Sequence, residues 1–225
     1  MKTNYPGHEK KYQKHRAQEH PGWSATEAVY TDFKAHVEGI MALGNAPKTG
    51  RLLELGCGAG NMTVWFAGKG YEAYGIDIAP TAIDWAKERS KRANVKAQFI
   101  IGDVVTLRDY SDCYFDFVFD GHCLHCIIGN DRPKLLGSVW RVLKPEGYLM
   151  INTMCGPVDP EQLEHYDPIT RSTFSGDIAT RYFGDADDIL TEITAARFEI
   201  VRYEFGQDEA NQPNHDLIVE ARKLK

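Results

Sequence analysis

Short apolar runs alternate with helical patterns between residues 51 and 152. The helical patterns have apolar residues at spacings of three or four, and we expect helices at about 62–69, 80–93 and 132–143. The apolar runs predict strands at Arg51–Leu55, Ala73–Ile78, Ala97–Ile101, Phe115–Phe119 and Tyr148–Asn152. This alternation indicates an α/β fold in which helices cover both faces of a parallel sheet.

The regions on either side of this core have different patterns. An apolar stripe in 25–43 predicts a helix, and the polar segment before it, 1–22, is expected to be a loose or weakly helical arm. Residues 155–184 show little periodicity, which is typical of lids and binding loops and less often of disorder. The remaining residues predict a helix at 183–196. They also predict two strands, Glu199–Phe205 and Leu217–Ala221, which are joined by a polar loop at 206–215 and close one edge of the sheet.

The first predicted strand ends at three glycines, Gly56, Gly58 and Gly60, and a helical pattern starts directly after them. Glycine is needed where the backbone takes a positive φ or passes close to a ligand. The N-terminus of the following helix offers free N–H donors at the same place. The loop therefore predicts a binding site for a nucleotide-like ligand.

The glycine spacing and the nearby acids narrow the choice of nucleotide. A dinucleotide loop has its third glycine three positions after the second, and that position is Asn61 here. Glu54 precedes the loop by two residues and suits a ligand that carries positive charge better than a pyrophosphate. Asp77 lies about 20 residues beyond the loop, where a carboxylate can meet ribose hydroxyls. Asp103 and Asp120 also follow predicted strands, so the pattern favours an adenosine ligand other than a dinucleotide.

Five segments in order resemble the successive motifs of class I S-adenosylmethionine-dependent methyltransferases. They are Glu54–Gly60, Gly75–Ala79, Gly102–Val104, Phe115–Asp120 and Leu143–Leu149. The resemblance implies a Rossmann-like, doubly wound sheet of seven strands, mostly parallel with an antiparallel C-terminal strand pair, and here an N-terminal helical extension. It also implies S-adenosylmethionine as the cofactor.

The resemblance gives a role to each matched residue of the first two motifs. Gly56, Gly58 and Gly60 would let the backbone approach the methionine part of the cofactor. Asp77 would bind both ribose hydroxyls, and Ile78 would pack on the adenine. The structural alternative for the glycines is that they only form a turn.

The later motifs carry further expected contacts. Asp103 would accept a hydrogen bond from the adenine amine, and Val104 would pack beside it or donate a backbone amide. Asp120 would lie near the methionyl amino group or the transferred methyl, and Glu54 near the cofactor's positive charge. The alternative for Asp103 is a helix N-cap.

The segment after the fourth strand, 120–126, contains both His-x-x-His and Cys-x-x-Cys. A zinc-type site and a redox pair are the competing interpretations, but interleaved side chains on one short turn point to different sides. We therefore expect no metal, and packing for Cys123 and Cys126. His125 is expected to be structural or next to the cofactor, whereas His122 and Asp120 are the catalytic candidates, with His122 as a base or substrate contact.

Composition and charge limit the partners. The 225 residues carry 26 Lys and Arg against 32 Asp and Glu, a formal net charge of −6, which argues against nucleic acid. The sequence has no run of 18 apolar residues, so we expect no membrane-spanning helix. Met1–His20 lacks the apolar centre of a secretory signal. Five cysteines, an odd number, are typical of reduced thiols. We expect a cytoplasmic protein with no membrane or nucleic-acid partner.

The chain is long enough for one domain, 1–225, with one hydrophobic core. We divide it into an N-terminal arm and helix (1–45), a cofactor-binding core (50–153), an irregular lid or substrate segment (155–184), and a helix with a strand hairpin (185–225). Aromatic and basic residues of the third part are expected over the sheet's carboxyl edge, where they either close on an acceptor with Trp23 or Tyr30 or only pack. They are Tyr166, Arg171, Phe174, Arg181 and Tyr182.

Motifs that mark known classes of acceptor are missing. The sequence has no Asn/Asp-Pro-Pro-aromatic tetrad after the fourth strand, no Pro-Cys pair of the cytosine type, and no basic RNA-binding appendage. We therefore expect methyl transfer by direct displacement to a small-molecule acceptor. The alternatives are a protein or RNA methyltransferase, a non-catalytic S-adenosylmethionine-binding protein, and a nicotinamide-dependent oxidoreductase, which Asn61 disfavours.

Overall fold

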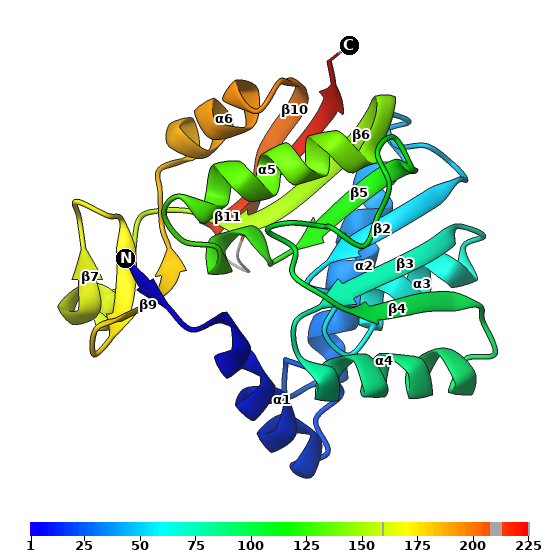
Figure 1. Ribbon diagram of the computed structural model, residues 1–225, viewed down its shortest axis with the longest axis horizontal. Coiled ribbons are helices and arrows are strands. Elements are labelled where there is room, and N and C mark those ends of the chain that lie inside the picture. Colours follow the sequence, from blue (N-terminus) through cyan, green and yellow to red (C-terminus); the bar gives the residue numbers. More distant parts are fainter. Residues whose placement is uncertain (159, 208–212, 225) are drawn as a thin grey trace.

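The computed structural model describes residues 1–158, 160–207 and 213–224. Within them, seven strands form the central sheet in the order β10–β11–β6–β5–β2–β3–β4 (Figure 1). The parallel part consists of β2 (Arg51–Leu55), β3 (Glu72–Asp77), β4 (Ala97–Ile101), β5 (Phe115–Gly121) and β6 (Leu143–Met154). This confirms the expected parallel core.

The C-terminal pair closes one edge of the sheet. Strand β11 (Pro213–Lys223) runs antiparallel to β6 and to β10 (Phe198–Gln207). The expected antiparallel ending is therefore confirmed. Of the polar loop expected at 206–215, residues 208–212 fall outside the described residues, and the others belong to β10 and β11.

Helices lie on both faces of the sheet, as the alternating pattern predicts. On one face lie α5 (Asp131–Val142) and α6 (Ala186–Ala195), and on the other α2 (Glu27–Met41) and α3 (Asn61–Gly68) (Figure 1). Neighbouring strand residues supply the two cores: Leu53 and Val118 pack with α5 and α6, while Leu52 and Phe117 pack with α2 and α3. Period-two side-chain alternation thus builds a doubly wound sheet with two buried layers.

The chain's N-terminal segment forms more structure than a loose arm. It contains β1 (Lys2–Thr3), η1 (Tyr5–Gly7) and α1 (His8–Ala17). Helix α1 lies against α4 (Pro80–Arg92), where Glu9 accepts hydrogen bonds from Thr81 N (3.0 Å) and Thr81 Oγ1 (2.5 Å). None of the helices in the described parts of the chain is long and apolar enough to cross a membrane.

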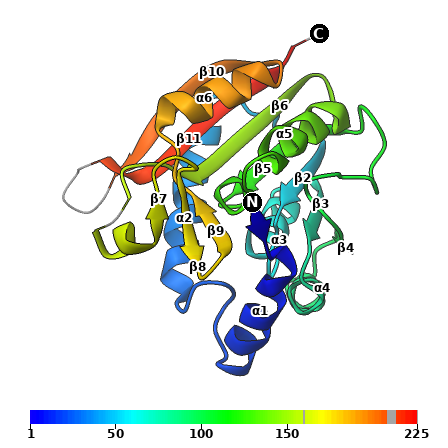
Figure 2. The ribbon, with the colours of Figure 1, turned by 60° about the vertical axis from the view of Figure 1, so that its left-hand side comes forward.

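The segment expected to be irregular also forms strands. After η3 (Pro160–His165), β7 (Tyr166–Asp167), β8 (Ser172–Ser175) and β9 (Ile178–Tyr182) join β1 in a separate sheet, which we call the small sheet (Figure 2). Its strands are short and rich in Ser and Thr, so they carry little periodicity. Since β9 pairs with β1 from the other end of the chain, no local pattern indicates this sheet.

Candidate active site

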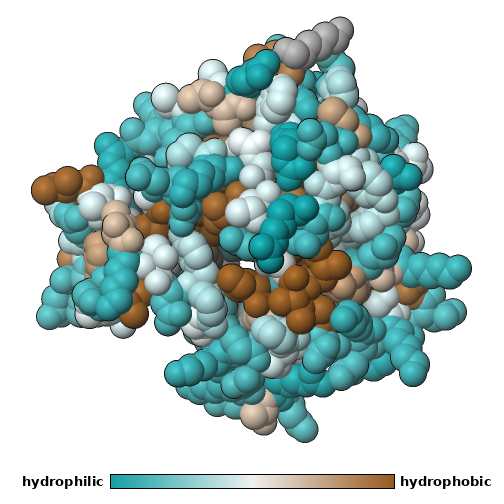
Figure 3. Space-filling view, viewed as in Figure 1, coloured by the Kyte–Doolittle hydropathy of each residue, from teal (hydrophilic) through white to brown (hydrophobic). Residues whose placement is uncertain are grey.

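A cavity of about 880 Å³ lies at the carboxyl edge of the central sheet. The glycine loop, the ends of the parallel strands, the N-terminal segment and β11 supply its walls. The space-filling view is hollowed between α1 and α5, and hydrophobic residues gather around this hollow (Figure 3). Small-molecule sites have volumes of roughly 300–1,000 Å³. The cavity therefore has the place and size of a ligand site.

The glycine loop forms one wall and needs its glycines. Gly56, Gly58 and Gly60 have φ angles of 57°, 52° and 75°, in the left-handed region. A Cβ at Gly56 would lie 2.8 Å from Cys123 Sγ, and Tyr12 of α1 packs directly on Gly58. The loop thus combines strained backbone with close packing, and α1 covers it.

Asp77, the last residue of β3, fixes the loop from below. Its Oδ2 accepts a hydrogen bond from Gly58 N (2.9 Å), and its Oδ1 accepts one from Ala79 N (2.9 Å). Burial raises the pKa of Asp77 to about 6, which these bonds partly oppose. Asp77 and the neighbouring Ile78 both line the cavity, as expected of them.

Glu54, Asp103 and Val104 line the same cavity. Glu54, on β2, accepts a hydrogen bond from Thr63 Oγ1 on α3, and burial raises its pKa to about 8. Asp103 follows β4 and accepts from Val105 N (2.8 Å), while its carbonyl accepts from Leu107 N. Asp103 therefore closes a turn and does not cap a helix.

Asp120 is held apart from this group. It is 1% exposed and is not among the described residues that line the cavity. Its Oδ1 accepts from Cys123 N (2.8 Å), and burial raises its pKa to about 7. The carboxyl group of Asp120 thus lies behind the turn that follows β5.

His122 reaches the cavity from the end of β5. Its φ of 74° is left-handed, which turns the chain sharply after the strand. Its backbone N–H donates to Asn152 O (2.8 Å), and its Nε2 lies 3.7 Å from Asp216 Oδ2 on β11. Desolvation lowers the pKa of His122, and Asp216 opposes that shift.

The rest of the turn packs between the glycine loop and α5. Cys123 lies against Gly56, and Cys126 Sγ is 3.9 Å from His122 O. His125 is buried and lines the cavity, and its Nδ1 has no hydrogen-bond partner within the described residues. In this part of the chain, no three His, Cys, Asp or Glu side chains come together as metal ligands.

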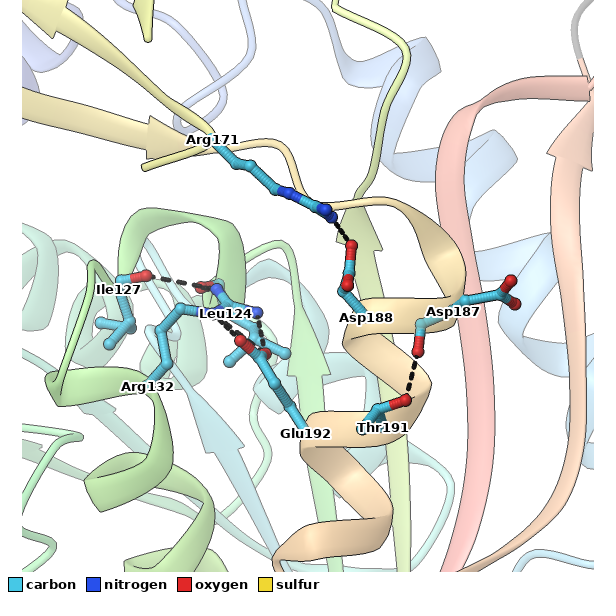
Figure 4. Close-up of polar contacts among 8 residues, drawn as sticks. All are labelled: Leu124, Ile127, Arg132, Arg171, Asp187, Asp188, Thr191 and Glu192. Atoms are coloured by element: carbon cyan, nitrogen blue, oxygen red, sulfur yellow. Dashed lines mark hydrogen bonds and ion pairs between the residues drawn. The ribbon is translucent and has the colours of Figure 1, made fainter. Parts of the chain in front are cut away.

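Arg132 of α5 ties this turn to α6. Its guanidinium donates to the carbonyls of Leu124 (2.7 Å) and Ile127 (3.2 Å) and pairs with Glu192 Oε2 (2.7 Å) (Figure 4). Its Cζ also lies 3.8 Å from the ring centroid of Tyr182 on β9. One buried cation therefore joins the cavity-lining turn, α6 and the small sheet.

Sequence reasoning missed several residues of the far wall. Asn152 on β6 and Asp216 on β11 line the cavity, and the only signal was a polar residue at the end of an apolar run. Trp23, Tyr30 and Arg181 line it as anticipated. Four other residues of the 155–184 segment do not: Tyr166, Arg171, Phe174 and Tyr182.

These residues fit S-adenosylmethionine as the cofactor. The glycine loop lines the cavity with its backbone, Asp77 presents a fixed carboxyl group, and Glu54 offers a buried acid. A doubly wound sheet with this loop and these strand-end acids defines the Rossmann-like class of nucleotide-binding proteins.

Comparison with known proteins finds similarity to methyltransferases over the central part of the chain. Residues 53–151 match the family described as a methyltransferase domain. A putative methyltransferase, YqeM of Bacillus subtilis, is 32% identical over 133 residues, which are 56% of this chain and 49% of that protein. The match therefore spans about half the length of that relative.

Solved structures share the fold over more of the chain. A SAM-dependent methyltransferase structure from Methanosarcina mazei superposes with a TM-score of 0.71 at 24% identity, covering 82% of this chain and 97% of that one. The 1,6-didemethyltoxoflavin-N1-methyltransferase of Burkholderia thailandensis, solved with its substrate and S-adenosylhomocysteine, gives 0.68 at 19% identity, covering 96% and 85%. Residues 53–151 therefore match a methyltransferase domain, and the chain shares its fold with S-adenosylmethionine-dependent methyltransferases.

Proposed function

We propose that this protein transfers a methyl group from S-adenosylmethionine to a small-molecule acceptor by direct displacement. The observation that carries the proposal is the single cavity of about 880 Å³, which continues from the glycine loop to a second, aromatic and polar half. That volume is in the range of small-molecule sites. The net charge of −6 gives no support to a nucleic-acid acceptor.

The cofactor half would use the residues around the glycine loop. Gly56, Gly58 and Gly60 would lie against the methionine part, Asp77 would accept from the ribose hydroxyls, and Glu54 would face the cofactor's positive charge. The adenine would lie between two apolar side chains, with a polar contact to a third residue: Ile78, Val104 and Asp103. Asp120, in this proposal, acts by fixing the turn that carries His122.

The chemistry asks little of the protein beyond alignment and exclusion of water. The cofactor supplies a methyl group on a sulfonium, which is a good leaving group. His122 would accept the proton when the acceptor's nucleophile begins protonated, because its lowered pKa leaves the imidazole neutral near pH 7. Asp216, 3.7 Å away, would stabilise the imidazolium that forms.

The acceptor half is lined by side chains suited to one small, partly aromatic molecule. Phe33 and His122 have ring centroids 5.6 Å apart, and Trp23 and Tyr30 line the cavity as well. Asn152 adds a buried Oδ1 with no partner among the described residues, ready to accept a hydrogen bond from an acceptor. The similar structure from B. thailandensis contains a bound small molecule, 1,6-didemethyltoxoflavin, together with S-adenosylhomocysteine.

A metabolite extract incubated with the protein and methyl-labelled S-adenosylmethionine tests the proposal. We expect label in a low-molecular-weight product that depends on His122 when His122→Ala is compared with the wild type. If label enters only protein or RNA, the acceptor is a macromolecule and the proposed small-molecule acceptor is wrong. Binding of S-adenosylmethionine with no transfer to any fraction would indicate a non-catalytic binding protein.

A further inference from the structure

A second cavity of about 550 Å³ adjoins the first, between the N-terminal segment and the small sheet. The two cavities share wall residues, so they are neighbours: Tyr5, His8, Trp23, Cys126 and Arg181. Thr173, Ser175 and Thr180, which carry hydroxyl groups, line the second cavity and not the first. A ligand in the acceptor half of the main cavity therefore has a polar space to extend into.

Positive charge gathers on the wall of this second cavity. Lys11 Nζ lies 4.3 Å from the ring centroid of Trp23, and Arg181 Cζ lies 6.0 Å from the same centroid. The ring of His8 lies 5.6 Å from that of Trp23. Desolvation lowers the pKa of Lys11 and of His8, and repulsion from Arg181 lowers both pKa values further.

Lys11 and Arg181 have no acidic partner within 4 Å in the part of the chain that the structure describes. Other buried or half-buried arginines of the same region are paired: Arg171 with Asp188, and Arg132 with Glu192 (Figure 4). Among the described residues, Arg181 donates to a backbone carbonyl, that of Thr180 (2.8 Å). Glu161 also lines the second cavity, but it forms no ion pair with Lys11 or Arg181.

We propose that the second cavity binds an anionic group of the methyl acceptor, a carboxylate or a phosphate, between Lys11 and Arg181. This inference rests on the proposed function, since it names the substrate class of that site. Two like charges held around one ring repel each other, and an anion between them removes that cost. The guanidinium of Arg181 supplies the hydrogen bonds that such an anion needs, whereas the hydroxyls of Thr173 and Thr180 bond to each other (3.0 Å) and form a polar wall beside it.

Inorganic phosphate and acetate are the probes that test the anion site. Phosphorus-31 NMR line widths of phosphate, and proton saturation transfer to acetate, are followed as protein is added, with and without S-adenosylhomocysteine. We expect one or both anions to bind, and Lys11→Gln and Arg181→Gln each to weaken that binding at least fivefold. Lys10→Gln, on the same helix but outside both cavities, is the matched control and should bind like the wild type.

Calorimetry with S-adenosylhomocysteine shows that the variants are folded, because neither Lys11 nor Arg181 is expected to touch the cofactor. Glu161→Gln removes the acid that the described residues place on this wall, and should bind phosphate at least as tightly as the wild type. The inference is overturned if neither anion binds to protein that binds S-adenosylhomocysteine, or if both cation variants bind anions like the wild type.

The product of the extract experiment separates the two sources of charge. We expect the labelled product to stay on an anion-exchange resin at neutral pH. Its release by alkaline phosphatase would assign a phosphate, and continued retention a carboxylate; a product in the flow-through would overturn the inference. Anion binding without S-adenosylhomocysteine binding would instead remove the proposed function and leave the anion site standing.

Discussion

Three carboxyl groups are buried at the carboxyl edge of the sheet. Burial raises the pKa of Glu54 to about 8, of Asp77 to about 6 and of Asp120 to about 7. The unfolded chain loses these protons near pH 4, whereas the folded chain keeps them to higher pH. The folded state therefore binds more protons over this range, and its stability falls as pH rises from about 4 to 8.

Glu54→Gln should remove part of this pH dependence, because glutamine has no proton to lose. Each unit of pKa difference corresponds to about 1.4 kcal/mol. Between pH 5 and pH 8 we expect the variant's free energy of unfolding to gain at least about 1 kcal/mol relative to the wild type. Urea denaturation at both pH values measures it, with the exposed Glu164→Gln as control. Equal pH slopes in Glu54→Gln and the wild type would contradict the assigned burial.

At the level of elements, the turn after β5 depends on contacts from three others. The side chain of Asp120 on β5 accepts a hydrogen bond from the N–H of Cys123, and Asn152 O on β6 accepts one from the N–H of His122. Arg132 on α5 donates to the carbonyls of Leu124 and Ile127. The turn carries His122 and His125 into the cavity. Small displacements of this turn would therefore act first on the acceptor half, while Asp77 holds the glycine loop from β3.

Arg132→Met should impair methyl transfer more than cofactor binding. It leaves the carbonyls of Leu124 and Ile127 without their donor, at about 1–3 kcal/mol for each buried group. We expect kcat/KM for the acceptor to fall at least tenfold and the affinity for S-adenosylhomocysteine to change less than twofold. Label-transfer kinetics and calorimetry measure the two effects.

Arg132→Lys and Lys134→Met are the comparison variants. Lysine keeps the charge opposite Glu192 but lacks the planar fork that reaches both carbonyls, so its transfer rate should lie in between. Lys134 is on the same helix with its side chain 63% exposed, and its removal should change neither quantity. A folded Arg132→Met with wild-type kcat/KM would show that the turn does not need this arginine.

Local patterns predicted the elements that depend on local chemistry. The bounds of β2 and β4 agree with the expected strands Arg51–Leu55 and Ala97–Ile101, because each is an apolar run flanked by loop residues. The small sheet was missed because Lys2 pairs with Ile178, a contact that no periodicity encodes. Arg181 was expected near Trp23 at the cavity, but the strand pairing that places it there was not.

The candidate site shows the same limit. Asp77 and Asp120 both lie at the carboxyl ends of strands, and the resemblance places both near the cofactor. After Asp77 the chain enters α4 and leaves the carboxyl group at the cavity, whereas after Asp120 the turn folds back and its Cys123 N–H covers the carboxyl group. Only the path of the chain beyond each strand separates the two.

At the scale of the whole molecule, segments far apart in sequence enclose one space. Helix α1 covers the glycine loop through Tyr12, the small sheet contributes Arg181, and β11 contributes Asp216. Between them lie the parallel strand ends that carry Glu54 and Asp77. We propose that this enclosed space holds S-adenosylmethionine next to its acceptor.

Calorimetric titration of the full chain with S-adenosylmethionine and, separately, with NAD tests that claim most directly. We predict binding of S-adenosylmethionine, at least tenfold weaker in Asp77→Ala, and no heat of binding with NAD. Asp77→Asn keeps an acceptor for Gly58 N–H and separates loss of the loop's support from loss of the ribose contact. Binding of NAD without S-adenosylmethionine, or unchanged affinity in Asp77→Ala, would contradict the account.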